Sequence, residues 1–432
     1  MNRPTRILRL RDEDAVAVTL DPLTAGVEVD VAGTALTALT TLTVRTDIPA
    51  GHKLAVVDIA DGAPVTKYGQ TIGYATSAIS IGDHVHTHNL AFADTTDTEI
   101  RIGSGVTPVP QEAATFQGIV RSDGRVATRN YVGIITSVNC SATVAKLISE
   151  QVRMSGVLAE HPSVDGVVAI THGSGCGLAS DGEGLELLKR TLSGYADHPN
   201  FGALIVLGLG CEVNQIAELE LPDNTPVVGM TIQDAGGTVA AVRAGVKAVT
   251  EVLPQIAVER QPVPASELVL GLKCGGSDGY SGITANPALG LAADRLIAQG
   301  GTAILCETPE IYGAEHLLAA RAEDPAVAAA LMDRIAWWRD YTARHGGSLD
   351  NNPSPGNKEG GISTILEKSL GAVAKAGSTP LKGVRRFAEP TASRGLIFMD
   401  TPGYDPVSVT GMVAGGANIV CFTTGRGSVY GC

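Results

Sequence analysis

Residues 131–154 read YVGIITSVNCSATVAKLISEQVRM, and they decide the fold class. The stretch begins as an apolar run typical of a buried strand and continues with the spacing of an amphipathic helix. Helical patterns recur in GEGLELLKRTLSGYA and GTVAAVRAGVKAVTEVL, and strand-like runs recur in VDGVVAITHGSGCG, FGALIVLGLGCE, ELVLGLKCGG, GGTAILCETPE, RGLIFMD and ANIVCFTTGRG. Strands that alternate with helices predict lobes built on mostly parallel α/β sheets.

The N-terminal quarter has a different pattern. Short runs rich in Val, Thr and Ile, such as AVAVTL and GVEVDVAG, are separated by Gly, Asp and Pro, which is typical of a small all-β domain. We therefore predict a multidomain chain. Its parts are an all-β domain at 1–103, a linker at 104–117, a first α/β lobe at 118–255 and a second α/β lobe at 267–432, with a second linker near 256–266.

Composition restricts the partners. The 432 residues carry a formal net charge of −13, which argues against nucleic acid, but a small anionic substrate needs only a few local Lys or Arg residues. No apolar segment approaches the roughly 20 residues of a membrane span, and the N-terminus has no signal-peptide core. Seven cysteines, an odd number, favour reduced thiols. We expect a cytoplasmic enzyme, and a homo-oligomer.

Four cysteines follow apolar runs and have Gly, Ser or Asn neighbours: Cys140, Cys176, Cys211 and Cys274. Ligands of open α/β sheets bind beyond the carboxyl ends of the strands, where these residues are expected. Thiolates are soft ligands suited to iron, zinc or an Fe–S cluster. The alternative is that each is a small packed hydrophobe.

Histidines alternate in the segment GDHVHTHN, as His84, His86 and His88. On a strand all three would point to the same face, which suits metal binding or acid–base chemistry. The alternative is a set of solvated surface histidines. Lys67, in the nearby KYGQTIGY, is a candidate partner for a carboxylate.

A third candidate site is NPSPGNKEGGISTILEKS, where Lys358 precedes an expected helix and could help to bind an anion. An ordinary surface loop explains the same residues. The chain has no GxxxxGK[ST] motif, and GLGC lacks the rest of a dinucleotide fingerprint, so nucleotide binding is unsupported.

Several segments together resemble the altronate/galactarate dehydratase family, which has a sulfolactate sulfo-lyase branch. They cover nearly all of the chain, and they are KYGQTIGYA, GDHVHTHN, GRVATRNYVGI, GLGCEVNQ, GLKCGGSDGYSGITANPALG, ETPEIYGAE, NPSPGNKEGGI and TPGYDPVSVTGMVAGGANIVCFTTGRG. The first ~100 residues resemble the SAF, or β-clip, domain. The resemblance implies loss of water from a hexonate or hexarate to give a 2-keto-3-deoxy acid, with iron(II) or manganese(II). Family chains continue past GRGSVYG, so we expect the second lobe to be C-terminally incomplete.

The resemblance also implies roles for the candidate residues. Removal of the α-proton needs a base, and departure of hydroxide needs an acid or a metal. His86, His88 and Lys67 would be catalytic, and the four cysteines would hold iron or an Fe–S cluster. Residues that would bind the substrate are Arg129, Asn139, Ser277, Asp278, Asn286 and Lys358.

Two other functions fit the same residues. A C–S lyase acting on a sulfonated hydroxy acid such as sulfolactate removes the same α-proton and differs in the leaving group. A sugar-acid sensor would use the β domain for recognition, and its Cys and His loops would be structural.

Overall fold

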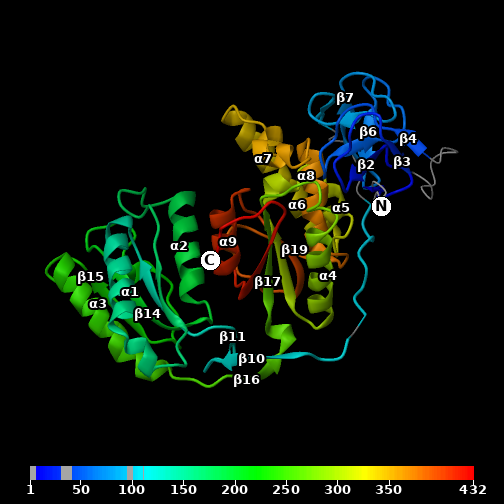
Figure 1. Ribbon diagram of the computed structural model, residues 1–432. Coiled ribbons are helices and arrows are strands. Elements are labelled where there is room, and N and C mark those ends of the chain that lie inside the picture. Colours follow the sequence, from blue (N-terminus) through cyan, green and yellow to red (C-terminus); the bar gives the residue numbers. More distant parts are fainter. Residues whose placement is uncertain (1–5, 31–40, 95–100, 110) are drawn as a thin grey trace.

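The computed structural model describes residues 6–30, 41–94, 101–109 and 111–432, and these form three domains (Figure 1). The N-terminal domain contains strands β1 to β9, the middle domain contains β12 to β15, and the C-terminal domain contains β17 to β21. The C-terminal domain lies between the other two (Figure 1). An all-β domain followed by two α/β lobes is the predicted fold class, and it is confirmed.

The N-terminal domain is built from short antiparallel strands in three small sheets, ordered β1-β2-β5-β8, β3-β4 and β6-β7-β9. Alternation of apolar and polar residues buries one face, as in β3, where only the central Val29 is buried. The strands are β1 (Ile7–Leu8), β2 (Val16–Thr19), β3 (Glu28–Asp30), β4 (Thr41–Thr43), β5 (Lys53–Ala55), β6 (Pro64–Lys67), β7 (Gln70–Ala75), β8 (His84–Val85) and β9 (Leu90–Ala91).

The middle domain is a parallel sheet of order β13-β12-β14-β15, with helices on both faces. Buried residues of α1 and α3 pack on one face, and Leu192 of α2 packs on the other. The helices predicted in the sequence are present. The elements are β12 (Tyr131–Thr136), α1 (Ala142–Ser155), β13 (Gly166–Ile170), α2 (Glu183–Ala196), β14 (Phe201–Gly208), β15 (Val227–Thr231) and α3 (Thr238–Val252).

The C-terminal domain is a second parallel sheet, of order β19-β20-β18-β17-β21. Helices α4, α6 and α8 bury one side of it, and α9 packs against the other. The elements are β17 (Val269–Gly275), α4 (Ala285–Ala298), β18 (Thr302–Cys306), α5 (Glu315–Ala319), α6 (Pro325–Arg344), α7 (Pro355–Glu359), α8 (Ile365–Val373), β19 (Leu381–Arg385), β20 (Gly395–Met399), α9 (Asp405–Ala414) and β21 (Ile419–Thr424).

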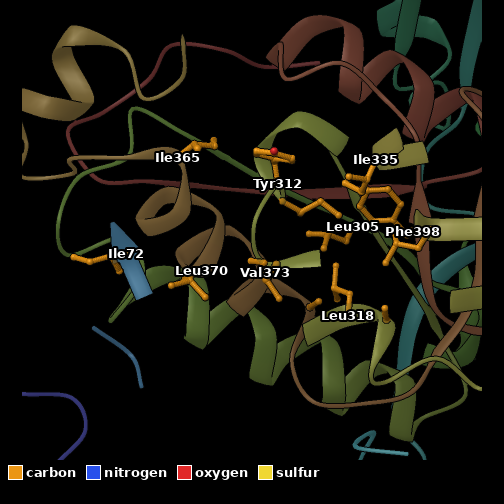
Figure 2. Packing of buried hydrophobic residues seen from close by; sticks show 14 of the residues in the cluster. Ile72, Leu305, Tyr312, Leu318, Ile335, Ile365, Leu370, Val373 and Phe398 are labelled. Atoms are coloured by element: carbon orange, nitrogen blue, oxygen red, sulfur yellow. The ribbon is translucent and has the colours of Figure 1, made fainter. Parts of the chain in front are cut away.

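One hydrophobic core runs through the N-terminal and C-terminal domains. Ile72 of β7 belongs to the same buried cluster as Ile365 and Leu370 of α8, and Figure 2 labels all three side chains among the residues of this cluster. Ile72 and Ile365 are both fully buried. Each such side chain contributes roughly 1.5–3 kcal/mol when it leaves water, so this contact fixes the two domains against each other.

The two segments predicted to be linkers pair with each other. β10 (Thr115–Val120) forms an antiparallel ladder with β16 (Gln261–Pro264), and β11 (Val126–Ala127) completes a three-stranded sheet. The middle domain therefore begins and ends at one small sheet, visible below the other domains in Figure 1. Among the described residues, no helix is both long enough and apolar enough to cross a membrane.

Candidate active site between the N-terminal and C-terminal domains

Glu367, in the first turn of α8, holds two lysines of the N-terminal domain. Its Oε2 is 2.8 Å from Lys53 Nζ and its Oε1 is 2.8 Å from Lys67 Nζ. All three side chains are at most 2% exposed. Burial alone would raise the pKa of Glu367, but the two ammonium groups lower it to about 2. The carboxylate is therefore ionised, and it is the shared counter-charge of the two buried ammonium groups.

The two lysines share one carboxylate, and their pKa values shift in opposite directions. Burial lowers the pKa of Lys53 to about 8, against the attraction of Glu367. Burial also disfavours the charged form of Lys67, but Glu367 and the neighbouring Tyr68 outweigh this effect and raise the pKa of Lys67 above its usual value. Lys53 Nζ donates a second hydrogen bond to the carbonyl of Gly361, at 2.6 Å. Lys67, predicted as a carboxylate partner for the substrate, is thus bound to an internal carboxylate.

Three histidines lie directly beside this ion-pair network. His52, His84 and His86 each offer a ring nitrogen, and these nitrogens lie within 4.8 Å of one another. His52 Nδ1 is 3.0 Å from His84 Nε2, and His52 Nε2 is 3.1 Å from the carbonyl of Glu359. His86 Nδ1 is 3.0 Å from Ser363 Oγ. Loop residues 359–363 of the C-terminal domain therefore help to orient these rings.

The three imidazoles are neutral at neutral pH. Burial, followed by the neighbouring histidines, lowers the pKa of His84 to about 3. Burial and then Lys53 lower the pKa of His86 to about 4, and burial lowers the pKa of His52 as well. Neutral imidazole nitrogens are the form that binds divalent metals. The donor set therefore fits a metal ion such as iron(II).

His88 lies at the exposed side of the cluster, with its ring centroid 5.2 Å from that of His84. The prediction that His84, His86 and His88 alternate along one strand is wrong in one respect, because β8 ends at Val85. The rings gather nevertheless, since the turn after β8 is closed by Asn89, whose Oδ1 accepts from the His86 backbone N–H at 3.0 Å.

A small cavity adjoins Glu367 on the C-terminal side. Its wall combines residues of both domains: Lys67, Tyr68, Cys274, Ser277, Asp278, Ser281, Asn286, Glu367 and Lys368. Asn286 is 2% exposed. Its Nδ2 donates to the Gly371 carbonyl at 2.9 Å, and its Oδ1 accepts from Thr423 Oγ1 at 2.6 Å. Both ends of this amide are therefore used within the protein.

Asp278 and Ser277 shape the loop after β17. Asp278 Oδ1 accepts hydrogen bonds from the backbone N–H groups of Tyr280 and Ser281, both at 3.0 Å. The carbonyl of Ser277 accepts from Asn357 Nδ2 at 2.8 Å. Gly279 touches the N-terminal domain so closely that a Cβ there would lie 2.0 Å from the carbonyl oxygen of Gly51. This loop thus forms part of the contact surface between the C-terminal and N-terminal domains.

Cys274 lies at the end of β17, in the cavity wall, and is 4% exposed. Lys375 Nζ lies 2.9 Å from its Sγ and is itself buried. The preceding Lys273 forms ion pairs with Glu307 and Asp405. Cys274 is therefore part of a buried charged region of the C-terminal domain, and it lies apart from the other three candidate cysteines.

Other predicted residues lie in the middle domain or at the edge of the interface. Arg129 is exposed, and its backbone N–H donates to Asn200. Lys358 is half-buried on α7, next to the Glu359 whose carbonyl contacts His52. The residues that the structure places in the middle domain are Arg129, Asn139, Cys140, Cys176 and Cys211.

Three residues of the site were missed in the sequence. His52 and Lys53 occur together in IPAGHKLAVVDIA, directly before a strand-like apolar run. A lysine at the start of such a run was the available signal, because a lysine is almost never buried without a partner. Glu367, in ISTILEKS, looks like an ordinary helix acid, and nothing local shows that it is buried.

Three family models match consecutive parts of the chain. Residues 5–93 match the altronate/galactarate dehydratase SAF domain. Residues 118–257 match the D-galactarate dehydratase/altronate hydrolase second domain, and residues 265–432 match the D-galactarate/altronate dehydratase C-terminal domain.

Three curated proteins are similar along most of the chain. Altronate dehydratase of Bacillus subtilis (strain 168) is 37% identical and that of Escherichia coli (strain K12) 38%, each over 98% of this chain and 84% of the relative. Galactarate dehydratase (L-threo-forming) of Escherichia coli (strain K12) is 36% identical over 89% of this chain and 76% of the relative.

Proposed function

The chain belongs to the altronate/galactarate dehydratase family and is a sugar-acid dehydratase, and we propose that it removes water at the interface of its N-terminal and C-terminal domains. The proposed substrate is an aldonate or aldarate such as altronate or galactarate, and the product is a 2-keto-3-deoxy acid. The observation that carries the location is the set of three neutral imidazoles beside the buried Lys–Glu–Lys network.

We propose that His52, His84 and His86 hold iron(II). Their ring nitrogens converge within 4.8 Å, and their lowered pKa values keep the three imidazoles neutral, each with one nitrogen that has a free lone pair. A bound divalent ion supplies Lewis-acid polarisation of a substrate oxygen. Imidazole nitrogens suit iron(II) better than manganese(II), which prefers oxygen ligands, and elemental analysis of the purified protein distinguishes the two metals.

The protein's own groups then have separate tasks. His88, exposed beside the cluster, is placed to accept the proton from the carbon next to the substrate carboxylate. Lys358, half-buried beside the same loop, supplies positive charge for that carboxylate, which gains electron density as the proton leaves. The C–O bond at the next carbon breaks, and the hydroxyl group leaves as water with a proton returned by the protonated His88. The resulting enol converts to the 2-keto acid.

The test is turnover under reducing conditions. Purified protein loaded with iron(II) is given altronate, galactarate and sulfolactate, and 2-keto acid and sulfite are measured. We expect keto acid from a sugar acid and no sulfite. His84→Ala should lose iron and at least about 100-fold in turnover, while His345→Ala, an exposed histidine that follows α6, keeps both. Sulfite release from sulfolactate would instead favour the C–S lyase, and binding of a sugar acid without turnover would favour a sensor.

We also propose that the enzyme works in the cytoplasm as a homo-oligomer. Its seven cysteines are all unpaired, which fits a reducing compartment. Light scattering coupled to size exclusion measures the mass in solution, and a monomer at micromolar concentration would contradict the second part.

A further inference from the structure

Three cysteines of the middle domain lie at one edge of its sheet. Cys140 follows β12, Cys176 follows β13 and Cys211 follows β14. The order β13-β12-β14 makes these three strands direct neighbours, and all of them are parallel. Their carboxyl ends therefore meet, and they bring three distant thiols to one place.

The loops that carry the thiols are bound to one another. The backbone N–H of Asn139 donates to the Ser174 carbonyl at 2.7 Å, which joins the first two loops. Gly175 lies so close to them that a Cβ would be 2.6 Å from the Ser137 carbonyl oxygen. Ser137 Oγ donates to Glu212 Oε1 at 2.6 Å, which joins the first loop to the third.

The supports are buried while the thiols face outward. Ser137 and Glu212 are at most 4% exposed, whereas Cys140, Cys176 and Cys211 are all exposed. Glu212 also accepts from the backbone N–H groups of Leu209 and Gly210, so the turn before Cys211 is fixed. A rigid buried frame that displays reactive groups is how a preorganised ligand set is built.

The three thiols are neighbours. Cys176 and Cys211 lie near enough to Cys140 to act electrostatically on its thiol, so the three sulfurs belong to one neighbourhood of the middle domain.

We propose that Cys140, Cys176 and Cys211 bind a [4Fe–4S] cluster through three of its four irons. The three sulfurs come from separate loops at the ends of neighbouring parallel strands, and cysteine thiolates are the ligands that hold Fe–S clusters. The nearby His172 is not a fourth ligand, because its Nε2 contacts the Thr136 carbonyl and its Nδ1 accepts from Ser174. The fourth iron is thus left for an oxygen ligand from solvent or from a small hydroxy acid.

This site is separate from the histidine site. Its ligands and supports all belong to the middle domain, which Figure 1 shows on the far side of the C-terminal domain from the N-terminal domain. The proposed cluster site can therefore be tested independently of the proposed iron(II) site. No redox change is needed to form it, because equal parts of ferric and ferrous iron with sulfide give the cluster core directly.

The experiment is anaerobic reconstitution of the full chain with ferric and ferrous iron, sulfide and a thiol reductant. We expect visible absorption together with about four irons and four acid-labile sulfides per chain. Cys140→Ser, Cys176→Ser and Cys211→Ser should each lose most of this sulfide. Cys274→Ser and Cys421→Ser, both in the C-terminal domain, should keep it.

Two controls keep the result clear. His84→Ala should lose the histidine-bound iron and retain the sulfide, so failure of one site does not imitate failure of the other. Circular dichroism of each apo-variant verifies that the middle domain is folded. Iron bound without sulfide, zinc bound in its place, a Cys140–Cys176 disulfide in the anaerobic protein, or full sulfide content in the folded serine variants would each overturn the proposal.

Discussion

Lys67 of the N-terminal domain and Glu367 of the C-terminal domain are 300 residues apart in sequence, and their charged atoms are 2.8 Å apart in a buried ion pair. Lys53 binds the other oxygen of the same carboxylate. Neither domain can neutralise its own charge here, because one contributes only cations and the other the anion. Neutralisation of these buried charges therefore depends on contact between the two domains.

Glu367→Gln should separate this interface. The substitution leaves two buried lysines without a counter-charge, and removal of one partner of a buried pair costs about 3–5 kcal/mol. We expect a lower urea midpoint and a loss of turnover. Glu359→Gln is the matched control, because the Glu359–Arg426 ion pair is exposed and should contribute less than about 1 kcal/mol. Equal midpoints for the two variants would contradict the structural role of Glu367.

Gly279→Ala should disrupt the close contact between the loop after β17 and the N-terminal domain. The new methyl group would meet the backbone of Gly51 and of Gly360, neither of which is a flexible side-chain end. Overpacking of this kind costs about 1–3 kcal/mol. Thermal unfolding measures it. Gly184→Ala, in α2 with open space around it, should be neutral or stabilising by up to about 1 kcal/mol. A stable and active Gly279→Ala enzyme would contradict the close contact between Gly279 and Gly51.

Asn286→Ala should reduce stability more than substrate affinity. Both polar ends of the buried amide bind the protein itself. Loss of this group removes the donor to the Gly371 carbonyl and leaves the Thr423 hydroxyl only its longer contact with the Lys273 carbonyl, at 3.3 Å. The expected cost is about 1–3 kcal/mol. The exposed Asn224→Ala serves as control. A raised KM at unchanged unfolding temperature would show instead that Asn286 contacts the substrate, as predicted in the sequence.

Acid should weaken the contact between the middle and C-terminal domains through His198. Its Nε2–H donates to the Ala417 carbonyl at 3.0 Å, and its Nδ1 accepts from the Asn200 N–H at 3.1 Å. Burial lowers the pKa of His198 from 6.5 to about 4. Because the unfolded chain binds the proton more readily, the stabilisation is complete above pH 6.5 and is lost as the pH falls toward 4.

The full size of this effect is about 3 kcal/mol. Unfolding midpoints measured between pH 7 and pH 4 should fall more steeply in the natural protein than in His198→Gln. His345→Ala should leave the slope unchanged, because this histidine is exposed. A His198→Gln variant with the natural slope would assign the acid sensitivity to other groups.

The fold class could be predicted from the sequence because it depends on local patterns. The apolar run before Cys140 and the helix after it follow from periodicity alone, and α1, α2 and α3 have almost the predicted bounds. The pairing of β10 with β16 could not be predicted. It joins Thr115 to Pro264, and their Pro-rich surroundings have the composition of linkers.

Only part of the site could be predicted from the sequence, because some of its residues meet only when the chain folds. His86 and His88 have a visible local pattern, but His52 joins them only because β5 and β8 are adjacent strands. Glu367 is chemically ordinary until folding buries it between Lys53 and Lys67. Lys67 has the predicted charge but an internal partner. Sequence patterns show which groups are present, whereas the choice of their partners is made by tertiary packing.

The pairing of β10 with β16 has a consequence for the construction of the chain. The two strands lie side by side, so the middle domain leaves and rejoins the rest through neighbouring backbone positions, Gly118 opposite Gln261. A short turn could therefore bridge the gap left by the whole domain. The remainder would keep its shared core and its histidine cluster, and the excised cassette would keep its three thiols. In modular terms, the three thiols belong to a domain that is inserted between neighbouring backbone positions.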